Sequence, residues 1–190
     1  MAKDMKPQKA DNLRGFLCRS ADRQYFSEVI RKNQINSTVY IETSIPSFYH
    51  ETRNEPEFVA MKNWTRLWWE NSKKRYTCYT SEAVFNELES GEYPKKEDKL
   101  DLIKSIPLLE INDEIEEIVE VYISNYLMPK DELGDALHLA IASFYKVDYL
   151  LTWNCNHLAN ANKKKHMRRI NERLRLHTPE VITPLEIMED

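Results

Sequence analysis

The sequence predicts an α/β domain built on a parallel sheet that is covered by helices on both faces. Three observations lead to this prediction: short runs of β-branched and aromatic residues, longer segments with apolar residues at helical spacing, and a regular alternation of the two from residue 37 to residue 184. Alternating strands and helices are typical of a parallel sheet. We expect residues 37–190 to form one domain, preceded by an extension over residues 1–36.

The first predicted strand covers residues 38–41, a compact β-branched and aromatic run that ends at Glu42. Pro46 prevents further strand pairing, so a loop is expected from there to about Pro56. A helix follows over residues 57–72, because aromatic and apolar residues recur there at helical spacing.

This predicted helix contains three tryptophans, Trp64, Trp68 and Trp69. Their spacing favours packing against the core. The alternative is that they form a platform on which nucleic-acid bases stack.

A second predicted strand covers residues 76–80, and Ser81 is well suited to cap the next helix. On that helix Glu87 lies on or beside the face that carries Val84 and Leu88. A carboxylate that faces inward needs a cation or a hydrogen-bond partner. Glu87 is therefore either part of a site or a structural glutamate that is paired with an arginine or exposed at the rim.

The second half of the domain continues the alternation. Residues 94–105 are charged and are expected to be mostly solvated. A short third strand at 107–111 leads into an amphipathic helix over 113–127 with an acidic outer face. A helix over 132–145, apolar on nearly every side, then leads into a fourth strand at 149–152.

The C-terminal part is strongly basic before a last strand at 179–182 and a tail at 185–188. From Lys163 to His177 there are seven Lys or Arg and one acid. This helix is either a solvated charged face or a surface that follows RNA phosphates. The candidate RNA-binding residues are Lys163, Lys164, Lys165, Arg168 and Arg169.

Composition limits the class of protein. The 190 residues are 42% hydrophobic and 31% charged, with net charge −4 and a pI near 5.8, so a surface coated uniformly with nucleic acid is not expected. Three cysteines without a CxxC pair, no secretory leader and no bilayer-spanning apolar run predict a cytoplasmic protein with reduced thiols. Only three glycines leave no Gly-rich phosphate loop.

The extension over residues 1–36 carries eight Lys or Arg against four Asp or Glu. Residues 1–10 are expected to be disordered, and residues 21–32 have the pattern of an amphipathic helix. The helix is either a docking arm for a partner or nucleic acid, or an ordinary extension that packs on the domain.

Polar residues close or open several of the apolar elements. Glu42 ends the first strand and Asn154 follows the fourth, while Asp135 opens the helix before the fourth strand. In parallel sheets the functional crevice lies beyond the carboxyl ends of the strands. These side chains and Glu87 converge if strands one and four are neighbours, which the pattern alone does not prove.

The chain resembles the PIN-domain ribonucleases, and specifically the VapC-type toxins of toxin–antitoxin pairs. The resemblance covers about residues 38–186 and is fairly specific because its motifs occur in this order and spacing. The motifs are VYIETS from Val39, the segment from Ser81 to Leu88, GDALHLA from Gly134, and LTWN from Leu151 with His157 and Leu158.

The resemblance implies a three-layer α/β/α sandwich with strand order 3-2-1-4-5 and an acidic pocket that binds Mg²⁺ or Mn²⁺ and cleaves single-stranded or loop RNA. By position, Glu42, Glu87 and Asp135 match the three acids that hold the metal, and Asn154 falls at a fourth. Asn156 falls where some relatives have another acid. The pocket-lining residues would be Thr43, Ser44 and Thr152. The implied partners are a small antitoxin and a second copy of the chain.

Two positions depart from this family pattern. Glu42 replaces the usual Asp and is one methylene longer, and Asn154 is neutral. Losing one carboxylate weakens a second metal site more than the first, so a single-metal arrangement is expected. Without a cation the clustered acids should have raised pKa values, except Asp135, whose charge the helix dipole favours.

Three hypotheses of function remain. The first is a metal-dependent endoribonuclease that acts as a toxin, in which the metal activates the attacking water and either another carboxylate oxygen or Asn154 orients it. His138 and His157 are alternative bases, with a structural role favoured for His138. The second is a catalytically weakened PIN module that binds RNA or a protein without cleavage. The third, an acid-nucleophile phosphatase, is disfavoured because the first strand lacks a DxD pattern.

Overall fold

The computed structural model describes residues 36–92, 94–128, 133–154 and 161–188. The chain divides into two units, Met1–Asn33 and Gln34–Asp190, and all described residues belong to the second. The predictions for residues 1–35, and those for Asn156 and His157, lie outside the described residues.

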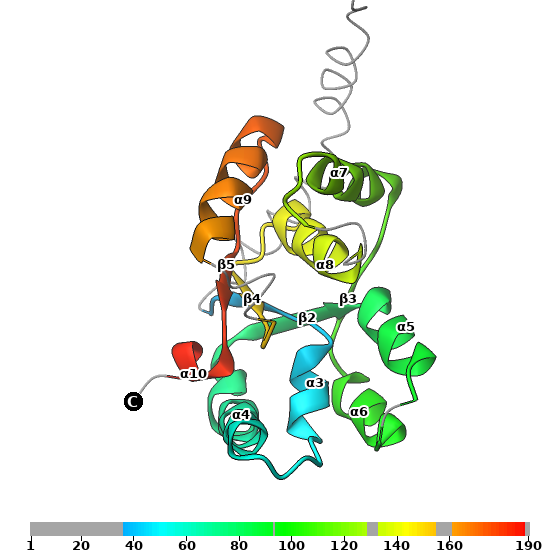
Figure 1. The fold of residues 1–190 in the computed structure, drawn as a ribbon, viewed down its shortest axis with the longest axis vertical. Helices are drawn as coiled ribbons and strands as arrows, with labels where there is room; N and C mark the ends of the chain where they lie inside the picture. Colours follow the sequence, from blue (N-terminus) through cyan, green and yellow to red (C-terminus); the bar gives the residue numbers. More distant parts are fainter. Residues whose placement is uncertain (1–35, 93, 129–132, 155–160, 189–190) are drawn as a thin grey trace, which may run out of the picture. The chain divides into compact units, whose positions relative to one another are not determined.

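The domain is organised around a parallel sheet of five strands in the order β3-β2-β1-β4-β5 (Figure 1). β1 pairs with β2 on one side and with β4 on the other. The α/β class is thereby confirmed, as is the strand order that the resemblance implied. The strands are β1 (Thr38–Ile41), β2 (Thr77–Ser81), β3 (Leu108–Leu109), β4 (Tyr149–Leu151) and β5 (Glu180–Ile182).

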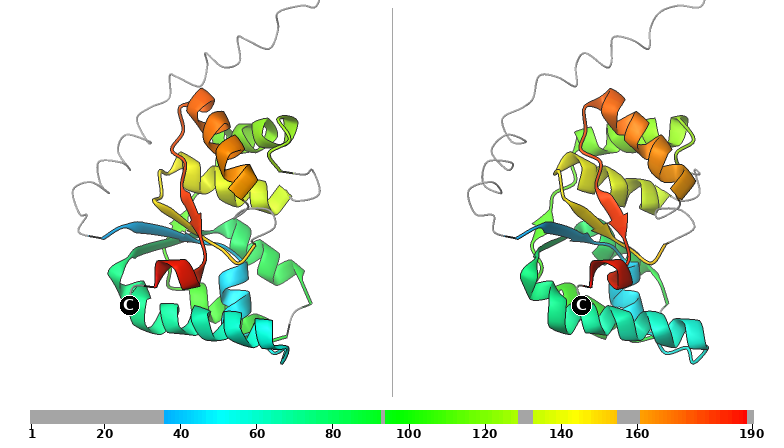
Figure 2. Two further views of the ribbon diagram at one scale, coloured as in Figure 1. Left: turned by 60° about the vertical axis from the view of Figure 1, so that its left-hand side comes forward. Right: turned by 90° about the vertical axis from the view of Figure 1, so that its left-hand side faces the viewer.

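Helices cover both faces of the sheet, which gives three layers (Figures 1 and 2). The lower layer in Figure 1 contains α3 (Ser44–Tyr49), α4 (Pro56–Leu67), α5 (Glu82–Ser90), α6 (Lys96–Ile103) and α10 (Pro184–Ile187). The upper layer contains α7 (Asp113–Ser124), α8 (Leu133–Phe144) and α9 (Ala161–Leu174). None of the helices in the described ranges has both the length and the apolarity needed to cross a bilayer.

The core lies on both sides of β1, whose four residues are all buried. A run without alternation is expected for a central strand that is covered on both faces. Trp68 is buried as the helical spacing predicted, while Trp64 and Trp69 are only half-buried. After α4 the chain continues as a short π-helix, η1 (Trp68–Ser72), and a 3₁₀ turn, η2 (Lys73–Arg75), before β2.

Two segments differ from the sequence-based expectation. Pro46 lies inside α3 rather than in a loop; it occupies the first turn, where a backbone N–H has no partner within the helix. The charged segment after residue 94 is mostly exposed, as expected; it forms α6, in which Ile103 is buried. The expected tail is α10, which Thr183 and Glu186 cap reciprocally.

Candidate active site at the carboxyl ends of β1 and β4

The strand order brings the ends of β1 and β4 together. Ile41 pairs with Leu151 at the last position of both strands. Because the strands are parallel, Glu42 and Thr152, which follow these residues, emerge at the same edge of the sheet. The adjacency that the sequence pattern left open is therefore present.

Glu42 is a buried carboxylate, with 4% of its surface exposed. The backbone N–H of Ser44 donates to it at 3.0 Å, and the hydroxyls of Ser44 and Thr152 also donate to it. Burial raises the pKa of Glu42 despite the nearby positive charge of His138 and these donors. Within the described ranges no Lys or Arg forms an ion pair with Glu42.

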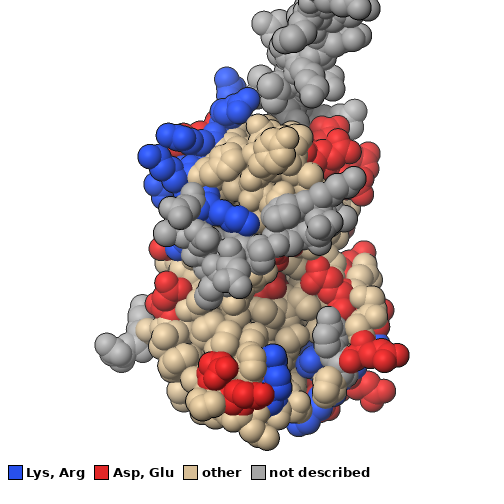
Figure 3. All heavy atoms as spheres, in the orientation of Figure 1, with Lys and Arg blue, Asp and Glu red and all other residues tan. Residues whose placement is uncertain are grey.

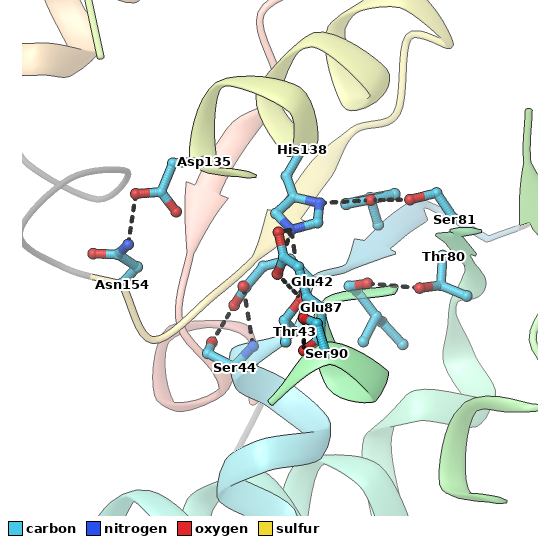
Figure 4. A network of polar contacts seen from close by, with 12 residues as sticks. Glu42, Thr43, Ser44, Thr80, Ser81, Glu87, Ser90, Asp135, His138 and Asn154 are labelled. Atoms are coloured by element: carbon cyan, nitrogen blue, oxygen red, sulfur yellow. Dashed lines mark hydrogen bonds and ion pairs between the residues drawn. The ribbon is translucent and has the colours of Figure 1, made fainter. Parts of the chain in front are cut away.

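Glu87 is half-buried and is held by two side chains from other elements (Figure 4). Thr43 Oγ1 donates to Glu87 Oε2, and His138 Nε2 lies 3.2 Å from Oε1 and 3.3 Å from Oε2. Burial opposes ionisation, but the hydrogen bonds and the charge of His138 outweigh it and lower the pKa of Glu87. The expectation that the metal-free acids have raised pKa values thus holds for Glu42 and is wrong for Glu87.

The His138 imidazole continues this contact into the core. Its Nδ1 atom lies 2.9 Å from the Tyr40 hydroxyl, which lies 2.7 Å from Ser81 Oγ. All three side chains are buried. Burial disfavours the imidazolium, but the hydrogen bond and charge of Glu87, with the charges of Glu42 and Asp135, raise the pKa of His138.

Sequence reasoning missed Tyr40 and Ser81 as parts of this network. Ser81 stands at the start of α5, as predicted, but its side chain makes no capping hydrogen bond and instead contacts Tyr40. The sequence did contain one indication of this network: Tyr40 and His138 each place a polar group in a mostly apolar element.

Gly134 allows Glu87 to approach the start of α8. A Cβ atom at this position would overlap the Oε1 atom of Glu87. Any larger residue would therefore displace a carboxylate that Thr43 and His138 hold in place. The neighbour of Gly134, Asp135, lies in the first turn of α8.

Asp135 forms a second group with Asn154 (Figure 4). Asn154 Nδ2 donates to Asp135 Oδ2 at 2.7 Å, and the Asn154 backbone N–H donates to Thr152 Oγ1 at 2.8 Å. Asp135 also lies close enough to His138 to influence its charge. All four predicted acid-site residues thus lie at the same edge of the sheet, in two hydrogen-bonded groups.

The side chains match a hard divalent cation in donor type, since carboxylate, hydroxyl and amide oxygens are its usual ligands. Glu42 in particular is a buried carboxylate whose charge no Lys or Arg in the described ranges compensates. Among the described residues, however, no group of three or more His, Cys, Asp or Glu side chains is arranged to hold a metal. The chemical types of the side chains therefore fit a divalent cation. Their present arrangement does not bring the carboxylates together, because Asp135 is hydrogen-bonded to Asn154 and Glu87 to His138.

The predicted RNA-binding residues lie on α9. Basic side chains gather over this helix, whereas acidic side chains gather over α7 (Figure 3). Lys165, Arg168 and Arg169 are exposed, and Lys163 and Lys164 are half-buried. Contact of these residues with phosphate stays a prediction.

The sequence matches no model of a protein family, and no curated protein matches it. The resemblance to PIN-domain ribonucleases therefore contributes to the proposal below and not to an assignment of family.

Proposed function

We propose that this protein is a metal-dependent endoribonuclease that cleaves single-stranded or loop RNA. The observation that carries the proposal is Glu42, a buried carboxylate without a Lys or Arg partner in the described ranges, at the end of the central strand. Glu87 and the Asp135–Asn154 pair lie at the same edge of the sheet. A buried negative charge of this kind is costly unless a cation accompanies it.

Glu42, Glu87 and Asp135 would hold one Mg²⁺ or Mn²⁺ ion. When bound, such an ion neutralises a phosphate oxygen and lowers the pKa of a coordinated water. The chain supplies the orientation: Ser44 and Thr152 fix the Glu42 carboxylate, and Thr43 and His138 fix that of Glu87. The amide of Asn154 fixes Asp135 and is the group that would orient the attacking water.

The biological role that the resemblance adds is that of a toxin restrained by a small antitoxin, acting as a homodimer in the cytoplasm. Expression of the chain should then arrest growth, and co-expression of a short reading frame encoded immediately upstream should relieve the arrest. Growth arrest that Asp135→Asn does not relieve would contradict a toxin that acts through this site.

The direct test is cleavage of structured and unstructured RNAs by the purified chain with Mg²⁺, Mn²⁺ or EDTA, beside Asp135→Asn. We expect metal-dependent cleavage of unpaired RNA that the variant reduces by about two orders of magnitude or more, the usual loss when a positioned catalytic group is removed. Cleavage that persists both in EDTA and in the variant would overturn the metal mechanism.

A second candidate is a PIN-like module that binds RNA or a protein partner without cleaving. Two contacts favour it: Glu87 is held by His138, and Asp135 is held by Asn154. These contacts keep the two carboxylates from forming a shared metal site in the described residues. Binding of RNA without cleavage under every metal condition would establish this candidate in place of the first.

A further inference from the structure

A row of aromatic rings extends from the candidate active site along α3 and α4. We name it the aromatic strip; it consists of Phe48, Phe58, Trp64 and Trp153. All four rings are half-buried, in contrast to the fully buried Trp68. Each of these residues therefore keeps part of its surface exposed to solvent, whereas Trp68 does not.

Trp153 joins the strip to the acidic site. Its backbone N–H donates to Ser44 Oγ at 2.8 Å, and the same hydroxyl donates to Glu42. Its indole Nε1–H donates to the buried Thr65 Oγ1 at 2.7 Å, which fixes the ring against α4. The backbone of Trp153 is therefore separated from the Glu42 carboxylate by one hydroxyl group, and its ring lies against α4.

The rings contact one another in sequence. Trp153 stacks on Trp64 with centroids 6.1 Å apart and an interplanar angle of 29°, and it meets Phe48 at 6.0 Å and 58°. Phe48 stacks on Phe58 at 6.3 Å and 29°. The four rings thus form one continuous series in which Trp153 lies between Trp64 and Phe48 and Phe58 is at one end.

The far end of the strip carries a fixed guanidinium plane. Arg53 Cζ lies 3.5 Å above the centroid of Phe58, and Arg53 Nη2 pairs with Glu51 Oε2 at 2.5 Å. The ion pair holds the plane on the ring, and 51% of the Arg53 side chain remains exposed. An arginine plane held in this way is a surface on which an unpaired base stacks.

We infer that the aromatic strip, with Arg53 at its end, binds the unpaired bases of an RNA strand whose phosphate lies at Glu42. The inference rests on the proposed function and specifies which part of the substrate the site recognises. Bases inside a duplex cannot present their faces to a protein, so the strip selects single-stranded RNA. Selection by stacking does not depend on base identity, because every base has a π-face.

Binding in EDTA tests the strip separately from cleavage. The probes are a labelled unstructured RNA, the same RNA annealed to its complement, and a version in which abasic residues keep the phosphates and remove the bases. The variants are Phe58→Leu, Trp64→Leu and Arg53→Gln. Trp69→Leu is the matched control, since it removes a half-buried tryptophan outside the strip. Circular dichroism confirms that each variant is folded.

We expect wild type and Trp69→Leu to bind the unstructured RNA about tenfold or more tighter than the duplex and abasic probes. Each strip variant should bind the unstructured RNA about tenfold more weakly and the other two probes as wild type does. Arg53→Gln keeps the test valid even if a ring variant fails to fold, because this arginine is on the surface. Unchanged binding by the folded variants would overturn the strip and leave the nuclease proposal standing. Absence of RNA binding by wild type in EDTA would overturn the strip, and the nuclease proposal would then be decided by the cleavage assay with metal. Absence of cleavage with intact strip-dependent binding would overturn only the nuclease activity.

Discussion

The Nε2 atom of His138 lies 3.2 Å from the Oε1 atom of Glu87. This contact joins α8 to α5 and ends a buried chain that starts at Ser81 and passes through Tyr40. Each imidazole nitrogen thus has a partner, as a buried histidine requires. The chain orients a carboxylate of the candidate site from inside the core.

The first prediction concerns this buried chain. Tyr40→Phe or His138→Phe leaves a polar partner unsatisfied in the core, and each should lower the free energy of unfolding by about 1–3 kcal/mol. The double variant removes both partners, so its loss should be smaller than the sum by at least about 0.5 kcal/mol. Urea unfolding measures all three. Strict additivity would show that the two groups do not interact.

The second prediction concerns Gly134. Gly134→Ala places a methyl group against Glu87 Oε1 and should push the carboxylate away from His138. A displacement of about 1 Å can lower the rate about 10²-fold, so RNA cleavage should fall steeply while thermal stability changes little. Gly91→Ala, at the end of α5, is the control and should retain activity. Full activity in Gly134→Ala would show that the position of Glu87 is unimportant.

The sequence predicted the sheet well because its strands are short apolar runs separated by helices of clear period. It could not supply the order of the strands, since strand neighbours such as Ile41 and Leu151 are far apart in sequence. The order came from a resemblance, and the structure confirms it.

The site was predictable at the level of which residues reach the edge of the sheet. The partner of each carboxylate was not. Glu87 pairs with His138 over a separation of 51 positions, and no local pattern specifies that distance. Ser81 shows the same limit, because its contact with Tyr40 takes the place of the expected helix cap. Pro46 is a second case, because the first turn of α3 accommodates a proline that was expected to lie in a loop.

The third prediction is a pH dependence of stability that originates at Glu42. The folded-state pKa of Glu42 is raised, so its contribution to stability is full below the ordinary value of 4.5 and is lost as the pH rises through the folded value. Each unit of the shift corresponds to about 1.4 kcal/mol.

Glu42→Gln is neutral at every pH, so in EDTA it should lose less stability than wild type between pH 4.5 and pH 8 and should be the more stable protein at pH 7. Glu89→Gln, on the exposed side of α5, should follow wild type. Thermal unfolding across this pH range measures the difference. Parallel profiles for wild type and Glu42→Gln would contradict a buried charge at Glu42.

The fourth prediction concerns the neutral position next to Asp135. Asn154→Asp replaces a donated hydrogen bond by a second negative charge, which should destabilise the metal-free protein by about 1–2 kcal/mol. The added carboxylate should also tighten Mn²⁺ binding, so saturating Mn²⁺ should recover the loss in thermal unfolding. Asn86→Asp, exposed on α5, serves as the control. A variant that stays destabilised in Mn²⁺ would place the metal elsewhere.

Mn²⁺ binding followed by electron paramagnetic resonance probes the metal site itself, because it needs neither RNA nor turnover. We expect one tightly bound Mn²⁺ per wild-type chain and loss of that ion in Glu42→Gln and Asp135→Asn, with Glu89→Gln unaffected. Equal binding by wild type and Glu42→Gln, or no bound ion in wild type, would contradict a metal site at the ends of β1 and β4.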